Sequence, residues 1–188
     1  MDFKTSATDY LNRLSLAISS IPMENVKQLL IELKDIREKK NQLFIFGNGG
    51  SAGNAMHLAN DYLYGIQGPN GPALRVNALP SNSSVITCLA NDEGYEKIFV
   101  EQLIALSNKS DLVLAFSGSG NSENIIQAIT WCKKNGVKTA AILGYSGGVV
   151  KNLVDIPIHI PVDDMQISED MQLIIGHMLM QQLHGSSC

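Results

Sequence analysis

The sequence predicts an α/β protein built on a doubly wound parallel sheet of the flavodoxin-like type, flanked by helices. Three observations support this fold class. Short apolar runs alternate with segments of helical periodicity, which is the pattern of a parallel sheet buried on both faces. Glycine-rich turns follow several of these runs, and 188 residues without a linker or an internal repeat suit one domain.

Two helices are expected before the first strand. Apolar residues recur at helical spacing over residues 3–21, where Pro22 interrupts the pattern, and again over residues 23–39. We expect this pair to form a helical hairpin over residues 1–40, in front of an α/β core over residues 41–188. Both parts are expected to belong to one single domain that spans the chain.

The core is expected to alternate strands with helices. Strands are predicted at residues 42–46, 73–79, 111–117, 138–143 and 156–160. Helices are predicted at residues 51–63, 96–106, 122–135 and 168–183, and residues 83–89 form either a helix or a turn. Ligands of open α/β sheets bind beyond the carboxyl ends of the strands, so the turns that follow the strands are the candidate sites.

Composition and charge exclude several classes of protein. With 14 Lys and Arg against 18 Asp and Glu, and no basic stripe, the chain is not expected to bind nucleic acid directly. No apolar run reaches the ~20 residues of a membrane span, and the first residues lack the pattern of a secretory signal. The cysteines Cys88, Cys132 and Cys188 form no CxxC pair and predict free thiols. We therefore expect a cytoplasmic protein that does not bind membranes.

The turn at residues 47–52 reads GNGGSA and matches the glycine pattern of a dinucleotide-binding loop. That pattern also requires an acidic residue about 20 positions later, which binds the ribose of the cofactor. Residues 66–84 contain neither Asp nor Glu. The turn is therefore not expected to bind a dinucleotide.

The turn at residues 117–122 reads SGSGNS and lies where a strand is expected to give way to a helix. Free backbone N–H groups and the positive end of the helix dipole favour an anion there, and the serine hydroxyls add donors. The turn has no lysine, which excludes a Walker A loop and favours a phosphomonoester over a nucleoside triphosphate. The alternative is a capped turn in which Ser122 is the N-cap of the helix, and Ser122 can serve both roles.

Two pairs of metal-ligating side chains lie on expected helices. His57 and Asp61 are four residues apart and share one helix face, while Glu169 and His177 are eight apart, roughly 80° around the axis. One histidine and one carboxylate from each helix could form a four-ligand zinc site. The alternative is that each histidine is structural or simply exposed.

Taken in order, four segments resemble the sugar isomerase (SIS) fold and, within it, the phosphoheptose isomerases, also called sedoheptulose 7-phosphate isomerases. The segments are residues 47–52, residues 55–57, residues 91–92 and residues 117–122. The resemblance covers essentially the whole chain, which makes residues 1–188 one SIS domain, and it implies a phosphorylated sugar as the substrate, with its phosphate on the serine turn. The positions that match or adjoin substrate-binding positions of the family are Asn48, Gly49, Gly50, Ser51, Asn91, Asp92, Ser117, Gly118, Ser119 and Ser122.

The resemblance also implies a cofactor, a set of catalytic groups and an assembly. The implied ligands of a Zn²⁺ ion are His57, Asp61, Glu169 and His177, and the implied catalytic groups are Asp61, Glu169 and His177. The family usually has Glu where this chain has Asp61, and Gln where it has Glu169. Family members form homotetramers with sites at subunit interfaces, and we expect the same here.

These features lead to one hypothesis and one alternative. The hypothesis is a cytoplasmic aldose–ketose isomerase of heptose biosynthesis that converts sedoheptulose 7-phosphate to D-glycero-D-manno-heptose 7-phosphate. The alternative is a non-catalytic, phosphosugar-binding regulatory protein of the SIS branch that is associated with replication initiation. The presence of both His57 and His177 favours the enzyme.

Overall fold

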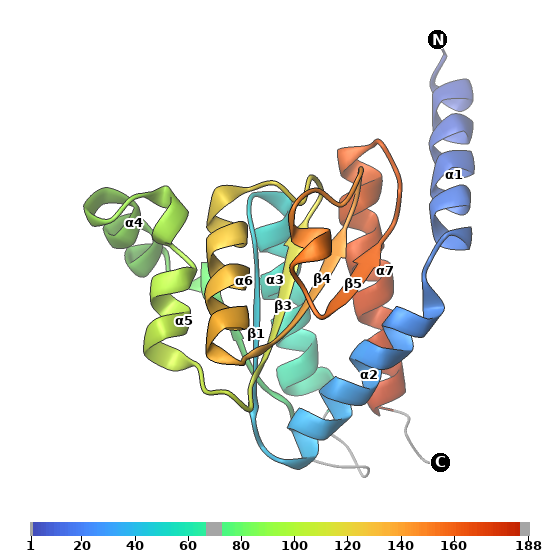
Figure 1. Ribbon diagram of the computed structural model, residues 1–188. Coiled ribbons are helices and arrows are strands. Elements are labelled where there is room, and N and C mark those ends of the chain that lie inside the picture. Colours follow the sequence, from blue (N-terminus) through green and yellow to red (C-terminus); the bar gives the residue numbers. More distant parts are fainter. Residues whose placement is uncertain (1, 67–72, 185–188) are drawn as a thin grey trace.

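The computed structural model describes residues 2–66 and 73–184 (Figure 1). Its five strands form one parallel sheet in the order β2-β1-β3-β4-β5, which is the flavodoxin-like order of doubly wound folds. The strands are β1 (Gln42–Gly47), β2 (Arg75–Ala78), β3 (Leu112–Ser117), β4 (Lys138–Leu143) and β5 (Ile156–His159). The predicted fold class is confirmed.

The helices lie close to the predicted segments, with two differences. The segment predicted as one helix over residues 96–106 is a 3₁₀ turn, Tyr95–Lys97, followed by α5, with the buried Ile98 and Phe99 between them. The helix predicted over residues 51–63 continues as a π-helical turn, Asp61–Gly65. The α-helices are α1 (Phe3–Ser19), α2 (Met23–Glu38), α3 (Gly50–Asn60), α4 (Ser83–Asp92), α5 (Val100–Leu106), α6 (Glu123–Asn135) and α7 (Met165–His184).

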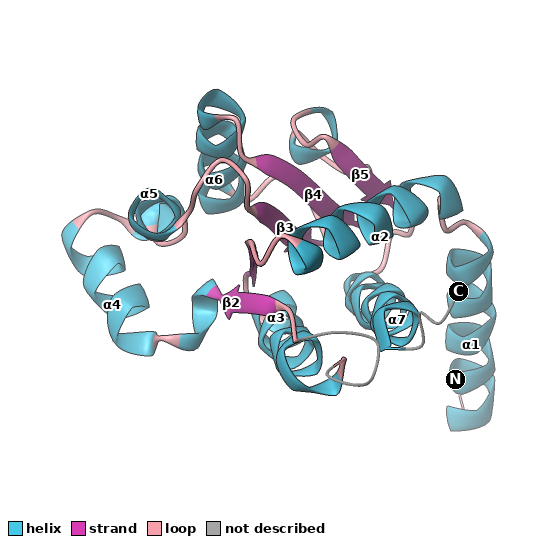
Figure 2. Cartoon of the chain, turned by 90° about the horizontal axis from the view of Figure 1, so that it is seen from below, coloured by secondary structure: helices cyan, strands magenta, loops and turns pink. Residues whose placement is uncertain are grey.

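The sheet separates two layers of helices, as Figure 2 shows, and a hydrophobic core lies on each of its faces. Alternate residues of a strand point to opposite faces. Leu43 and Ile45 of β1 pack in the layer of α2, α3 and α7, while Phe44 and Phe46 pack in the layer of α5 and α6. All four are fully buried, so the strand reads as a continuous apolar run although its side chains alternate between two cores.

The two N-terminal helices do not form the expected hairpin. α2 packs on the sheet and on α7, with Leu29 and Leu33 fully buried. α1 instead lies against α7 and extends beyond the body of the molecule (Figure 1), where the Tyr10 hydroxyl donates a hydrogen bond to the Asp170 carboxylate. Pro22 at the start of α2 redirects the chain. α2 then buries its apolar stripe against the core, while α1 packs only Tyr10, Leu14 and Ala17 against it and leaves Phe3, Leu11 and Leu16 exposed.

Three smaller expectations concern the chain as a whole. Among the described residues, no helix combines the length and the apolar composition that crossing a bilayer requires. Cys88 and Cys132 are free thiols, as predicted, while Cys188 lies outside the described residues. The division of the domain at residue 40 stays a prediction.

Candidate active site

The serine loop, residues 117–122, joins β3 to α6 at the carboxyl end of the central strand. The Ser117 hydroxyl accepts a hydrogen bond from the Gly120 N–H at 3.0 Å, and the Ser119 hydroxyl accepts one from the N–H two residues later at 3.2 Å. Ser122 holds the N-cap position of α6, but its side chain caps no N–H group in the described structure. The hydroxyl of Ser122 is therefore available to a ligand.

A second glycine-rich turn, which follows β4, holds the serine loop in place. The Gly144 N–H donates to the Gly118 carbonyl at 3.0 Å, and the Val150 N–H donates to the Gly120 carbonyl at 3.1 Å. The two turns approach so closely that a Cβ on Gly120 would collide with the carbonyl of Gly147, and the φ of Gly120 is +65°. Only glycine meets both conditions. Backbone contacts thus fix the shape of the serine loop before any ligand binds.

Asn48, at the start of α3, is held in one orientation by two side chains that the sequence analysis did not single out. Its amide exchanges a pair of 2.9 Å hydrogen bonds with the amide of Asn124, and its oxygen also accepts a 3.0 Å bond from the Tyr95 hydroxyl. Asn124 is buried. The sequence contains one sign of this contact: Asn124 is a polar residue at a position of α6 that faces the core, and a buried amide requires hydrogen-bond partners.

A cavity of about 250 Å³ lies between the serine loop and the start of α3, and Met165 and Glu169 of α7 complete its wall. Asn91 and Asp92 lie outside this cavity, at the end of α4, where the Asn91 amide donates to the Asp92 carboxylate at 2.7 Å. The other predicted substrate-binding residues line the cavity: Asn48, Gly49, Gly50, Ser51, Ser117, Gly118, Ser119 and Ser122.

The hydroxyl of Ser51 links α3 to α7 through a hydrogen bond. It accepts a 2.9 Å hydrogen bond from the Gln172 amide, whose oxygen in turn accepts a 2.9 Å bond from Asn54. Ser51 and Gln172 are both buried. Gln172 was also missed in the sequence, although a buried amide on an apolar helix face is a sign of such a contact.

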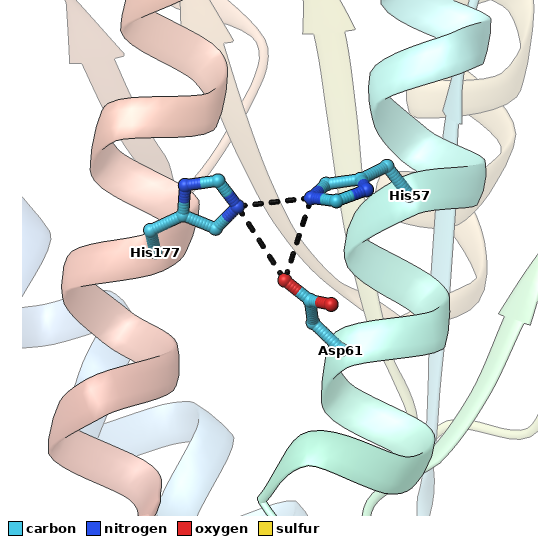
Figure 3. A group of neighbouring side chains, drawn as sticks. All are labelled: His57, Asp61 and His177. Atoms are coloured by element: carbon cyan, nitrogen blue, oxygen red, sulfur yellow. Dashed lines mark hydrogen bonds and ion pairs between the residues drawn. The ribbon is translucent and has the colours of Figure 1, made fainter.

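His57, Asp61 and His177 converge between α3 and α7, as Figure 3 shows. Nε2 of His57 lies 3.0 Å from Nε2 of His177. Oδ2 of Asp61 lies 3.5 Å from the first nitrogen and 3.4 Å from the second. The histidine side chains are 51% and 45% exposed and that of Asp61 is 19% exposed, so the cluster is open to an incoming molecule on one side.

Close packing of α3 on α7 brings the two histidines together. Gly176 faces Leu58, and a Cβ at Gly176 would lie 2.6 Å from Leu58 Cδ2. The fully buried Tyr62 donates its hydroxyl proton to the Gly176 carbonyl at 2.9 Å. Burial raises the pKa of Tyr62, which keeps that hydroxyl a donor. This bond links the residue after Asp61 to the residue before His177.

The donor set and its spacing fit a zinc ion. Tetrahedral ligands at 2.0–2.2 Å from zinc lie about 3.3–3.6 Å apart, and the three edges of this cluster are 3.0, 3.4 and 3.5 Å. Among the described residues, these three form the group of His, Cys, Asp and Glu side chains close enough to share an ion. The two edges to the carboxylate fall within the range for zinc ligands, and the edge between the histidines is 0.3 Å below it.

Glu169 does not join this cluster. It precedes His177 by eight residues on α7, a rise of about 12 Å along the axis, and its carboxylate packs against Gly50 at the start of α3. The angle between the two side chains around the helix favoured a shared site, but the rise separates them. The predicted four-ligand set is thus reduced to three, and Glu169 lines the serine-loop cavity instead.

Comparison with known proteins places the chain in a family. A model of the SIS domain matches residues 8–144. The phosphoheptose isomerase of Helicobacter pylori is 36% identical over 156 residues, which cover 83% of this chain and 81% of that protein. The chain belongs to the phosphoheptose isomerase family of SIS-domain proteins. The family member from a Nitratiruptor species is 38% identical over 146 residues, or 77% of this chain and 78% of that protein.

The likeness to the phosphoheptose isomerase family extends to the fold over nearly the whole chain. A phosphoheptose isomerase from Francisella tularensis superimposes with a TM-score of 0.89 at 26% sequence identity, covering 98% of this chain and 99% of that one. The chain also shares its fold with the phosphoheptose isomerase of Neisseria gonorrhoeae. That superposition has a TM-score of 0.86 at 22% identity and covers 96% of this chain and 97% of that one.

Proposed function

We propose that this chain is an aldose–ketose isomerase that converts sedoheptulose 7-phosphate to D-glycero-D-manno-heptose 7-phosphate in heptose biosynthesis. One observation carries the proposal: a hydroxyl-lined cavity suited to a phosphate and a cluster of titratable side chains lie along the same two helices, α3 and α7. The names of the relatives support this substrate. A cytoplasmic location fits the free thiols of Cys88 and Cys132.

The serine loop is the proposed phosphate site. Hydroxyls of Ser117, Ser119 and Ser122 and the first N–H groups of α6 are donors that a phosphate can accept from. Neither lysine nor arginine is among the described residues that line the cavity. Binding therefore depends on neutral donors and the helix dipole, and their fixed geometry matters more than the charge of any side chain.

Asp61 and His177 are the proposed acid–base pair. Isomerisation requires a base that takes a proton from the hydroxyl-bearing carbon beside the carbonyl and returns it to the former carbonyl carbon. It also requires a group that protonates the carbonyl oxygen, which gives the enediol, and then removes the proton of the neighbouring hydroxyl as the new carbonyl forms. Oδ2 of Asp61 faces the two histidines (Figure 3). Oδ1 accepts only a 3.4 Å hydrogen bond from the Asn60 amide, and we assign it to take the proton from carbon. His177 then moves the protons at oxygen, because an imidazole nitrogen can both donate and accept a proton.

We further propose that His57, Asp61 and His177 bind Zn²⁺, in line with the distances between their ligand atoms. A bound zinc ion would act as a Lewis acid on the carbonyl oxygen of the substrate. Metal analysis of protein purified without a histidine tag, in wild type and His57→Ala, tests this assignment. About one zinc per chain in the wild type and a large loss in the variant are expected; equal content in both would contradict it.

The proposed assembly is a homotetramer with active sites at subunit interfaces. Phe3, Leu11 and Leu16 of α1 are 87%, 63% and 72% exposed, and α4 has no fully buried residue. Apolar side chains exposed in this number on the projecting helix α1 are typical of a surface that packs against another copy. Elution near four times 20.4 kDa is expected, and a monomer at micromolar concentration would contradict it.

A coupled isomerase assay on a panel of phosphosugars tests the activity itself. Turnover of sedoheptulose 7-phosphate above that of pentose and hexose phosphates is expected. The alternative function, a regulatory SIS protein, requires neither histidine, and the convergence of His57 with His177 favours the enzyme. Binding of phosphosugars without turnover of any of them, in zinc-supplemented protein, would support the regulatory protein instead.

A further inference from the structure

Glu169 is the single ionisable side chain among the described residues that line the serine-loop cavity. The rest of the wall offers hydroxyls, the Asn48 amide, backbone groups and the apolar side chains of Phe116 and Met165. A carboxylate repels the phosphate that such a wall is suited to bind. Its position in the cavity therefore calls for a functional explanation.

Two helices begin at this cavity, and each presents the positive end of its dipole. α6 begins directly after the hydroxyls of the serine loop. α3 begins at Gly50, and the Glu169 carboxylate lies so close that a Cβ on Gly50 would be 2.5 Å from Glu169 Cδ. A carboxylate of the chain itself thus lies beside the anion-favouring end of α3, which leaves the end of α6 for the ligand.

We propose that Glu169 is a specificity-determining residue that limits the site to sugars with one anionic group. The inference rests on the proposed phosphosugar function. With the phosphate on the serine loop, the sugar chain passes Glu169, whose carboxylate accepts hydrogen bonds from hydroxyls and repels a second phosphate or a carboxylate. Sugar bisphosphates and phosphorylated sugar acids are rejected by this repulsive element rather than by lack of space.

The expected discrimination is at least tenfold. A ligand whose second charge lies about 5 Å from the Glu169 carboxylate, in a cavity connected to solvent, should bind at least tenfold more weakly than a ligand with a hydroxyl at the same place. Among the described residues that line the cavity there is no cationic side chain to offset the repulsion. Replacing the carboxylate of Glu169 by the isosteric amide should therefore remove most of the discrimination.

Glycerol 3-phosphate and 3-phosphoglycerate are the probes, because they have the same length and differ only in a terminal hydroxymethyl or carboxylate group. Calorimetric titration measures both with wild type, Glu169→Gln and Glu169→Ala. The control is Glu123→Gln, which removes an equal charge at the first residue of α6 but does not line the cavity. Direct binding keeps the measurement independent of turnover.

Wild type and Glu123→Gln should bind glycerol 3-phosphate at least tenfold more tightly than 3-phosphoglycerate, and both Glu169 variants should reduce that preference to under about threefold. An unchanged preference in Glu169→Gln, or an equal loss in Glu123→Gln, would overturn the role of Glu169. Equal binding of both probes by the wild type would also overturn it and leave the phosphate site standing. Binding of neither probe would overturn the phosphate site as well.

Discussion

The two halves of the candidate site are built in different ways. The serine loop is fixed by main-chain contacts with a neighbouring turn, and Ser117 at its start is buried. The cluster of His57, Asp61 and His177 consists of side chains from two helices, with both histidines about half exposed. The shape of the serine loop thus depends on the folded backbone, whereas the geometry of the cluster depends on half-exposed side chains of two helices. Substitutions in the cluster should therefore lower kcat, whereas substitutions in the serine loop should lower stability or raise KM.

The largest effect is expected in the cluster. His177→Ala and Asp61→Ala should each lower kcat by at least about 10²-fold, the usual contribution of a positioned acid–base group. Thermal unfolding should be unchanged, because neither side chain belongs to the hydrophobic cores. His184→Ala, on the last turn of the same helix, is the control and should retain full kcat. Full activity in both cluster variants would refute the assignment.

Lengthening the side chain of Asp61 tests its role in the cluster more specifically than removing it. Asp61→Glu restores the methylene that the family usually has, so kcat should stay the same or rise. Asp61 begins the π-helical turn that follows α3, and such turns often accompany functional sites. A fall of 10²-fold or more would instead mean that the backbone here is adapted to the shorter side chain, since misplacement by about an ångström has an effect of that size.

Substitution of a glycine in the serine loop is expected to lower the stability of the protein. Gly120→Ala combines a φ of +65° with a collision against Gly147, and should lower the free energy of unfolding by at least about 3 kcal/mol. Gly136→Ala is the matched control, because its φ is +73° with no atom within 4 Å of the added Cβ, so only the ~1 kcal/mol of the left-handed conformation is expected. Urea unfolding of both variants measures the difference. Equal losses would show that the contact between the turns contributes nothing.

A smaller effect is expected when only one donor of the loop is removed. Ser119→Ala should raise KM for the phosphosugar about tenfold or more, the weight of one hydrogen bond to a charged group, with little change in kcat or stability. Ser146→Ala is the control: its hydroxyl also accepts from the N–H two residues later, at 3.4 Å, but it does not line the cavity. Steady-state kinetics of the two variants should differ in KM, and a normal KM in Ser119→Ala would place the phosphate elsewhere.

The smallest effect concerns α1, which lies in neither region. The hydrogen bond that Tyr10 donates to Asp170 raises the pKa of Tyr10 to about 12. A raised pKa means that this contribution is complete below pH 10, the ordinary value, and is lost as the pH rises through about 12. Tyr10→Phe should thus lower the free energy of unfolding by about 1 kcal/mol at pH 8, and its difference from wild type should shrink between pH 10 and 12. A difference that stays constant with pH would contradict the docking contact.

Much of the molecule was predictable because the signals are local. The five strands, the serine loop and the start of α3 follow from apolar periodicity and from glycine and serine at turn positions. The relation between α1 and α2 was not predictable. Two amphipathic stripes joined by a short turn can pack on each other or on a third element, and here the third element was α7 together with the sheet.

Local patterns were enough to predict which segments become strands and helices, where the serine loop lies and which side chains are candidates for the chemistry, because each pattern involves residues within a few positions of one another. Which of those side chains meet depends on how distant elements pack. His57 and His177 are 120 positions apart and meet because Gly176 lets α7 approach Leu58 of α3. Glu169, on the same helix as His177, is removed from that cluster by about 12 Å of helix rise. Register between distant helices comes from packing, and no local pattern encodes it.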